Sequence, residues 1–273
     1  KINNDLLNNY IKNGASKRNL STLKEESYNL FNILSLFDLQ DYFSLLKSKK
    51  TPQLIQLIMD SDTNMIPFEI LNDGYDFLSD YIIFSRLLID SQNNSSSEFL
   101  INTNNDFTII SDPSESIDIS NDTIDEINNI SNIIDSTFQL KGPYKNRHVN
   151  KIEIIRLLGA SSLFHFSGHY IEKKNLSGWK LYNDIFTFSD IKKIIKSPDF
   201  LFSNTCGSST NFFMKFIKSL LDKGSKVILS SIGALPSERA TEFSQIFYKY
   251  FLIKGYSVGQ SFFLSRKEMI NIY

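Results

Sequence analysis

Two side chains with reactive chemistry stand out in the sequence of 273 residues, a histidine at position 169 and the only cysteine, at position 206. His169 follows the run Ser161-Ser-Leu-Phe-His-Phe-Ser-Gly, and Cys206 follows Asp199-Phe-Leu-Phe-Ser-Asn-Thr. Each run is short and apolar and ends in small polar residues, which is typical of a β-strand close to its end. We therefore predict that both side chains lie just past the carboxyl end of a strand.

In an open parallel sheet, ligands and catalytic groups collect in the crevice outside the carboxyl ends of the strands. A thiol and an imidazole that meet there can perform nucleophilic catalysis, with the imidazole as the base or as the counter-ion of the thiolate. The alternative for Cys206 is an inert buried thiol, because free cysteine is among the most buried residue types. Its polar neighbours and the helix expected directly after it favour the reactive role, since a helix N-terminus stabilises a thiolate.

His165 and His169 are four residues apart, a spacing that on a helix places two metal ligands on one face. The segment has strand character instead, and no carboxylate or cysteine cluster in the sequence completes a ligand set. We therefore expect no metal and no other cofactor. His165 is interpreted as a core or near-site histidine, and His148, which has basic neighbours, as a solvated one.

Composition limits the classes of function. The chain carries 29 basic and 30 acidic residues and has no basic cluster longer than residues 47–50, so we expect no binding to nucleic acid. No apolar stretch approaches the length of about 18 residues that a membrane-spanning helix needs. A single cysteine cannot form an internal disulfide, which indicates a reducing, cytoplasmic setting.

Periodicity in the first half of the chain predicts helices and strands in turn. Apolar residues at helical spacing over residues 17–50 predict two helices with a break near Asp38. An amphipathic helix is predicted over residues 122–138. Strands are predicted over residues 53–59, 81–86, 99–102 and 107–111. This alternation favours an α/β sheet with right-handed crossovers.

In the second half, helices are predicted over residues 151–158, 191–196, 209–223, 236–253 and 259–272, and a further strand over residues 225–230. Residues 141–150 are expected to form a loop because they are basic and contain glycine and proline. Residues 172–179 are expected to form a charged loop that closes on Gly178. Ser189 and Asp190 are expected to cap the helix that follows them.

The ordered motifs of this chain resemble those of the CHAT family, caspase-like peptidase domains that are often attached to TPR repeats. The resemblance rests on several short motifs in the right order rather than on one strong motif. The matching segments are Ile66-Pro-Phe-Glu-Ile-Leu71, Phe84-Ser-Arg86, Phe107-Thr-Ile-Ile-Ser-Asp-Pro113, Phe164-His-Phe-Ser-Gly-His169, Phe186-Thr-Phe-Ser-Asp190, Leu201-Phe-Ser-Asn-Thr-Cys206, Gly224-Ser-Lys-Val-Ile-Leu-Ser-Ser-Ile232 and Gly255-Tyr-Ser-Val-Gly-Gln-Ser-Phe-Phe-Leu-Ser-Arg266. We therefore expect a CHAT domain over residues 51–273 after a helical N-terminal extension over residues 1–50.

The resemblance implies an α/β fold of the caspase–hemoglobinase type, with a mostly parallel sheet flanked by helices. It implies a catalytic dyad of Cys206 and His169, with the backbone N–H groups of Cys206 and of Gly168 or Tyr170 as the oxyanion hole. Relatives usually have glycine directly after the catalytic histidine, where this chain has Tyr170. A backbone donor survives that change, whereas a conformation reserved for glycine would not.

The resemblance also indicates which residues would bind substrate. In the wider clan, residues beside the catalytic cysteine line the pocket for the substrate residue before the scissile bond. Relatives that prefer Arg or Lys tend to carry Asp two positions before the cysteine, where this chain has Asn204. Asp184 and Asp190 are candidates for an acidic wall, although Asp190 is also explained as a helix cap. A preference for basic residues therefore stays open.

Glu69 and Arg86 belong to two of the matching motifs. We predict that they form a buried ion pair that holds two strands together. Loss of one partner from such a pair typically costs about 3–5 kcal/mol.

Taken together, these features predict a cysteine endopeptidase that cleaves another protein. The family implies a bacterial defence or regulated-death system, with an activating or sensor protein that releases the activity. The alternative is a catalytically silent CHAT-like module that binds a partner protein through the same crevice, and Tyr170 favours it. A doubly wound nucleotide-binding domain fits poorly because the sequence has no Gly-rich loop of the P-loop or dinucleotide type.

Overall fold

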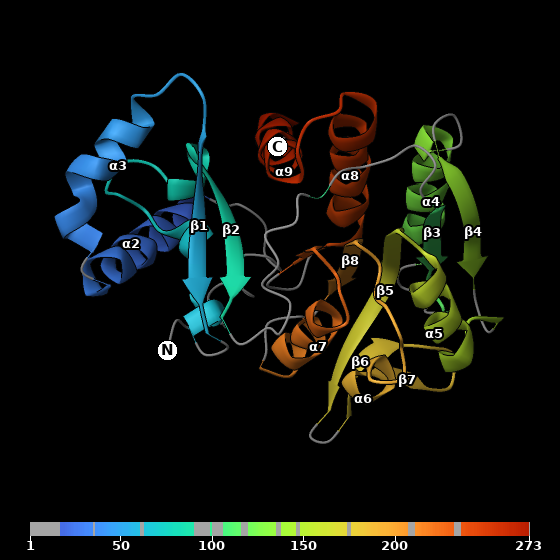
Figure 1. Cartoon of the computed structure of the whole chain (residues 1–273). Helices are drawn as coiled ribbons and strands as arrows, with labels where there is room; N and C mark the ends of the chain where they lie inside the picture. Colours follow the sequence, from blue (N-terminus) through green and yellow to red (C-terminus); the bar gives the residue numbers. More distant parts are fainter. Residues whose placement is uncertain are drawn as a thin grey trace. The chain divides into compact units, whose positions relative to one another are not determined.

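The computed structural model describes residues 17–34, 36–60, 63–89, 99, 106–115, 120–134, 138–145, 148–173, 176–206, 211–231 and 236–272. The chain divides into two compact units, and Figure 1 shows their elements coloured along the sequence. Unit 1 lies within Lys1–Ile89 and Tyr256–Tyr273, and unit 2 is Asp90–Gly255. The boundary predicted between residues 50 and 51 falls inside unit 1.

Unit 1 is a two-stranded parallel sheet with helices. The predicted helices over residues 17–50 are confirmed as α2 (Lys17–Ile33), the short 3-10 helix η1 (Leu36–Leu39) and α3 (Gln40–Lys47). Strand β1 (Gln53–Met59) pairs with β2 (Ile82–Leu88) along its whole length. Three further 3-10 turns, η2 (Thr63–Met65), η3 (Phe68–Ile70) and η4 (Leu78–Asp80), connect the two strands. The C-terminal helix α9 (Val258–Ile272) also belongs to this unit.

The core of unit 1 joins segments that are far apart in the sequence. Phe31 of α2 and Phe43 of α3 pack with Leu71, Leu78 and Ile82. A methyl group on Gly259 would lie 2.9 Å from the Ile83 side chain, so α9 approaches β2 closely at a glycine. Residues 51–89 therefore share one core with the N-terminal helices.

Within the residues that the structure describes, the sheet of unit 2 has seven strands and is mixed. They are β3 (Asp106–Ser111), β4 (Gln139–Lys145), β5 (Leu163–Lys173), β6 (Leu176–Lys180), β7 (Ile185–Thr187), β8 (Phe200–Cys206) and β9 (Val227–Ser230). The parallel part has the order β4-β3-β5-β8-β9, and β6 and β7 pair antiparallel beyond the end of β5. The prediction of a mostly parallel sheet is therefore corrected to a mixed sheet, because β5 outlasts its parallel neighbours and turns back into a hairpin.

Three local predictions in unit 2 were wrong. Part of the loop expected over residues 141–150 is β4, an edge strand that tolerates Pro143 at a shift of register beside Thr108. The loop expected over residues 172–179 is largely the β5–β6 hairpin, which is anchored by the fully buried Trp179. The helix expected over residues 191–196 is the short α6 (Phe188–Ile191), which begins earlier because Thr187 is its N-cap.

The helices of unit 2 cover the two faces of its sheet. They are α4 (Ser120–Ile134), α5 (Lys151–Ala160), α6, α7 (Asn211–Asp222) and α8 (Ser237–Tyr248), and α8 continues into the π-helical turn η6 (Lys249–Ile253). Figure 1 shows α4 and α8 in the upper part of this unit and α5, α6 and α7 in the lower part. Phe164 and Phe166 of β5 pack with Trp179 on the α5–α7 side, whereas His165 between them contacts Tyr248 of α8.

One predicted strand lies almost entirely outside the described residues. Of the strand predicted over residues 99–102, only Phe99 lies within the described residues, and its ring stacks on Phe200 and Phe251.

Among the described helices, none combines the length and the apolar character that crossing a membrane requires. The long helices predicted over residues 122–138, 209–223, 236–253 and 259–272 are confirmed with shifted ends.

Candidate active site

The candidate site lies where β5 and β8 run side by side. These two strands pair in parallel from Leu163 opposite Phe200 to His169 opposite Cys206. Their last register pair is therefore the histidine and the cysteine that the sequence singled out, in strands that lie about 4.8 Å apart. Strand β5 continues past His169 into the hairpin, so His169 lies at the end of the parallel pairing rather than at the end of its strand.

His165 and Ser167 lie on the same face of β5 as His169, because alternate residues of a strand share a face. The His165 side chain is fully buried, and its Nδ1 atom lies 3.0 Å from the Tyr248 hydroxyl. This confirms the interpretation of His165 as a core histidine near the site. His148 is exposed, as predicted.

A buried carboxylate from α4, that of Glu126, meets this face of the sheet. Glu126 is 1% exposed. It accepts a hydrogen bond of 2.6 Å from Asn204 Nδ2 and a short hydrogen bond from Ser167 Oγ. His165 Nε2 lies 3.3 Å from Glu126 Oε1. Burial by itself raises the pKa of Glu126, but the opposing effects of His165 and of the Ser167 hydrogen bond leave this pKa below its ordinary value.

Sequence reasoning missed Glu126, although a signal for it was present. The residue lies on the apolar stripe of α4, four residues before the fully buried Ile130. An acidic residue inside such a stripe is unusual, because an ionised carboxylate is almost never fully buried without partners. The periodicity could therefore have marked Glu126, but not the residues that it contacts.

Three predicted site residues line one small cavity. His169, Gly168 and Asn204 surround a volume of about 20 Å³ together with Glu126, Ser167 and the α8 residues Ser237, Ala240 and Thr241. A cavity of this size has room for about one water molecule. The structure thus brings the histidine, one candidate oxyanion residue and one candidate substrate-binding residue together.

Tyr170 faces the other side of the sheet. Its ring is buried edge-to-face against Phe213 and Phe216 of α7, at centroid distances of 5.0 and 5.8 Å. Burial, together with the nearby Glu172, raises the pKa of its hydroxyl. In the described chain the non-glycine residues with positive φ are Asp112 and Glu115, so Tyr170 has a backbone conformation open to any residue.

The two candidate acidic residues lie apart from Asn204. Asp190 accepts hydrogen bonds of 3.0 Å from the backbone and the hydroxyl of Thr187, which makes a capping box, and it pairs with Lys193 at 2.8 Å. Burial raises the pKa of Asp190, but the hydrogen bonds from Lys193 and Thr187 bring it below its ordinary value. Asp184 pairs with Lys151 of α5 at 2.8 Å. Asn204 contacts α4 and α8 instead.

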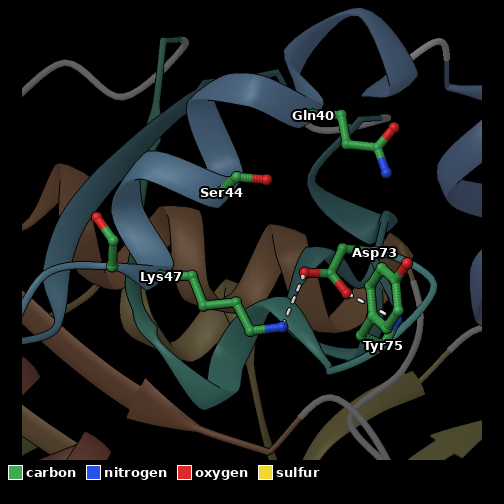
Figure 2. A pocket seen from close by; sticks show the side chains of 6 residues that line it. Gln40, Ser44, Lys47, Asp73 and Tyr75 are labelled. Atoms are coloured by element: carbon green, nitrogen blue, oxygen red, sulfur yellow. Dashed lines mark hydrogen bonds and ion pairs between the residues drawn. The ribbon is translucent and has the colours of Figure 1, made fainter.

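Unit 1 contains a larger pocket, which Figure 2 shows from close by. It has a volume of about 390 Å³ and is lined by Gln40, Ser44, Lys47, Ser48, Asp73 and Tyr75. Lys47 Nζ lies 2.6 Å from Asp76 and 3.7 Å from Asp73, and the hydrogen bond to Asp76 is the main cause that raises the pKa of Lys47. The cation in this pocket is thus already paired, and the pocket contains none of the predicted site residues.

Comparison with known proteins supports the fold class. No family model matches the chain, and no curated protein sequence matches it. A chain of the Saccharomyces cerevisiae separase–securin complex is similar in structure, with a TM-score of 0.55 and 20% sequence identity. The match covers 78% of this chain and 14% of that chain. At this identity the likeness concerns the fold alone, and it is consistent with a caspase-like fold.

Proposed function

We propose that the chain is a cysteine endopeptidase of the CHAT, caspase-like type, with Cys206 as the nucleophile and His169 as its base. The observation that carries the proposal is the register of β5 and β8, in which these two residues are partners in the last parallel pair. Register partners of parallel strands lie on the same face of a sheet. The caspase-like fold supports the same assignment, because a cysteine–histidine dyad belongs to that class of protease.

In the proposed reaction, the Cys206 thiolate attacks the carbonyl carbon of the scissile peptide bond, and the carbonyl oxygen becomes an oxyanion. The backbone N–H groups of Cys206 and of Gly168 or Tyr170 donate hydrogen bonds to that oxygen. His169 gives a proton to the leaving amine as the C–N bond breaks and a thioester remains. Water then attacks the thioester with His169 as the base, which releases the carboxylic acid product and restores the thiol.

The substrate and partners are part of the same proposal. We propose that the substrate is another protein and that Asn204, beside His169, contributes to its binding. Asp184 and Asp190 would contribute from a separate position, where they pair with Lys151 and Lys193. In the similar solved structure separase is in complex with securin, and by analogy an activating or sensor protein would control this chain. A cytoplasmic role in bacterial defence or regulated death completes the proposal.

A catalytically silent module that binds a partner is the second candidate, and Tyr170 was the reason for it. The backbone of Tyr170 has an ordinary φ, and its side chain packs into the core opposite the His169 face. The replacement of glycine by tyrosine therefore leaves a backbone N–H in a conformation that either residue adopts. This geometry favours the peptidase over the silent module.

The rate of alkylation of Cys206 as a function of pH tests the dyad. In the wild type we expect an inflection well below the free-thiol value of about 8.5, and in His169→Ala an inflection near that value. His148→Ala is the matched control, since His148 is exposed, and it should behave like the wild type. Cleavage of a peptide library should then be lost in Cys206→Ala. A slow, unshifted profile in the wild type would overturn the peptidase and favour the binding module.

A further inference from the structure

The proposed mechanism gives no role to the Glu126 carboxylate, which is buried in unit 2. It is buried on α4, and its two oxygen atoms have different partners. Oε1 accepts the Asn204 amide at 2.6 Å, and Oε2 accepts the Ser167 hydroxyl. Packing alone does not explain a carboxylate at this position, because an apolar side chain of similar size would fill the same space without the free-energy cost of burying a charge.

The two donors are register partners. Ser167 of β5 pairs with Asn204 of β8, and His169 pairs with Cys206 two residues further along the same two strands. Because the side-chain period of a strand is two residues, both pairs lie on the same face of the sheet. Glu126 therefore bridges β5 and β8 at the register pair that directly precedes the proposed dyad on that face.

Helix α8 holds the bridge from a second side. The Asn204 amide also donates to the carbonyl of Ala240 at 3.2 Å. Helix α8 is itself fastened to α4, since the Thr241 hydroxyl donates to the Asp122 carbonyl at 3.1 Å and Ser237 donates to the Asp122 side chain. The carboxylate is thus fixed relative to both helices, and a shift of β5 at Ser167 or of β8 at Asn204 would break one of its hydrogen bonds.

The charge state of Glu126 agrees with this arrangement. Burial alone would raise its pKa, but the neighbouring His165 and the hydrogen bonds bring the pKa below its ordinary value, so the group is ionised near neutral pH. An ionised carboxylate accepts hydrogen bonds at both oxygens, whereas a protonated one donates at one of them. The bridge to both donors therefore depends on the charge.

We propose that Glu126 is a positioning residue for the proposed dyad, in which it clamps β5 to β8 near the end of their parallel pairing, through Ser167 and Asn204, so that His169 and Cys206 stay in register. This inference rests on the proposed function. Glu126 acts through the two strands and does not take part in the chemical steps.

Three variants of α4 separate this role from a purely structural one. Glu126→Gln removes the charge and places an amide donor at one of the two oxygens. Asp125→Asn removes the same charge from an exposed neighbour on the same helix. Ile130→Val removes one methylene group from the core beneath α4 and lowers stability without touching the clamp.

In Glu126→Gln we expect kcat on a peptide substrate to fall roughly tenfold or more, with KM within about twofold, because a small misplacement of catalytic groups has a large effect on rate. The inflection of the Cys206 alkylation profile should move toward about 8.5. Amide hydrogen exchange should be faster where the parallel pairing of β5 and β8 ends and unchanged in β1 and β2. Asp125→Asn should match the wild type, and Ile130→Val should lower the melting temperature without moving the inflection.

The outcomes separate the clamp from the dyad. If Glu126→Gln behaves like Ile130→Val, with a lower melting temperature but an unchanged kcat and inflection, the positioning role is overturned. If the wild type shows no inflection that depends on His169, the proposed peptidase fails, and hydrogen exchange alone decides on the clamp. In that case, faster exchange confined to the end of the parallel pairing between β5 and β8 supports the clamp, and unchanged or uniformly faster exchange overturns it.

Discussion

Glu69 and Glu126 are both acidic residues inside the fold, but their partners give them different properties. Glu69 meets a guanidinium in unit 1, with hydrogen bonds of 3.0 Å from Arg86 Nε and 2.5 Å from its terminal nitrogen. Glu126 in unit 2 meets the neutral donors Ser167 and Asn204, and the Nε2 atom of His165 lies 3.3 Å from its carboxylate. The first arrangement is an ion pair, and the second is a buried carboxylate held by neutral hydrogen-bond donors.

Stability should depend on the ionisation of Glu126. Its pKa in the folded chain is below its ordinary value of 4.5, so the charge contributes stability that is fully present above that value. This contribution is lost as the pH falls through the folded-state pKa. We expect the melting temperature of the wild type to fall more steeply than that of Glu126→Gln when the pH is lowered from about 7 to about 3. Parallel slopes for the two proteins would contradict the assigned pKa.

The ion pair of Glu69 and Arg86 that the sequence predicted is present, but it is only partly buried, with side-chain exposures of 24% and 16%. It joins β2 to the 3-10 turn η3 rather than to a second strand, because Glu69 lies on η3. Arg86 also donates to the backbone carbonyls of Asn64 and Ile66, so it ties β2 to the turns before η3. We expect Glu69→Gln to lower the free energy of unfolding by about 1–3 kcal/mol, because Arg86 keeps its charge and loses its counter-ion.

Urea unfolding of Glu69→Gln measures this loss. The control is Glu153→Gln, which breaks an Arg–Glu pair of α5 in which Arg156 is 57% exposed. We expect this change to cost less than about 0.5 kcal/mol, as for most exposed pairs. Equal losses in the two variants would mean that the Glu69 pair has no special role.

At the scale of elements, strand β5 connects the two halves of the unit 2 sheet. Its first seven residues pair in parallel with β8, and residues 170–173 pair antiparallel with β6. The change of direction occurs directly after His169. The hairpin carries Trp179, which stacks on Phe166 at a centroid distance of 4.2 Å and anchors the antiparallel part in the core.

Gly178 is the residue that permits the close contact between β6 and β7. A Cβ atom at this position would lie 1.9 Å from the carbonyl oxygen of Phe186, and a backbone atom cannot move aside. We expect Gly178→Ala to cost about 1–3 kcal/mol or more of unfolding free energy. Gly159→Ala in α5 is the control, since its new methyl group would meet nothing closer than 3.9 Å, and it should be neutral or stabilising by up to about 1 kcal/mol. Similar values in urea unfolding for the two variants would refute the steric argument.

At the scale of the whole molecule, the two units have separate cores. Phe31, Phe43 and Leu71 belong to the core of unit 1, and Phe166, Trp179 and Phe216 to that of unit 2. All residues of the candidate active site lie in unit 2, and the sequence motifs around Glu69, Arg86 and Arg266 lie in unit 1.

Because each unit has its own core, we expect two unfolding transitions in calorimetry. Glu69→Gln should lower the transition of unit 1, and Gly178→Ala should lower that of unit 2, each with a smaller effect on the other. A single transition that both substitutions shift equally would show that the units unfold as one.

The sequence by itself determined the local features of this protein. Apolar periodicity identified the long helices, and the short apolar runs before His169 and Cys206 identified β5 and β8, because both signals depend on neighbours along the chain. The motif order also indicated the caspase-like class and the pairing of Glu69 with Arg86. Only the tertiary structure decided that β6 and β7 make the sheet mixed, that β4 is an edge strand and that residues 51–89 share a core with α2. It alone revealed Glu126 beside Ser167 and Asn204, since contacts between distant segments depend on packing and strand register, which local patterns do not encode.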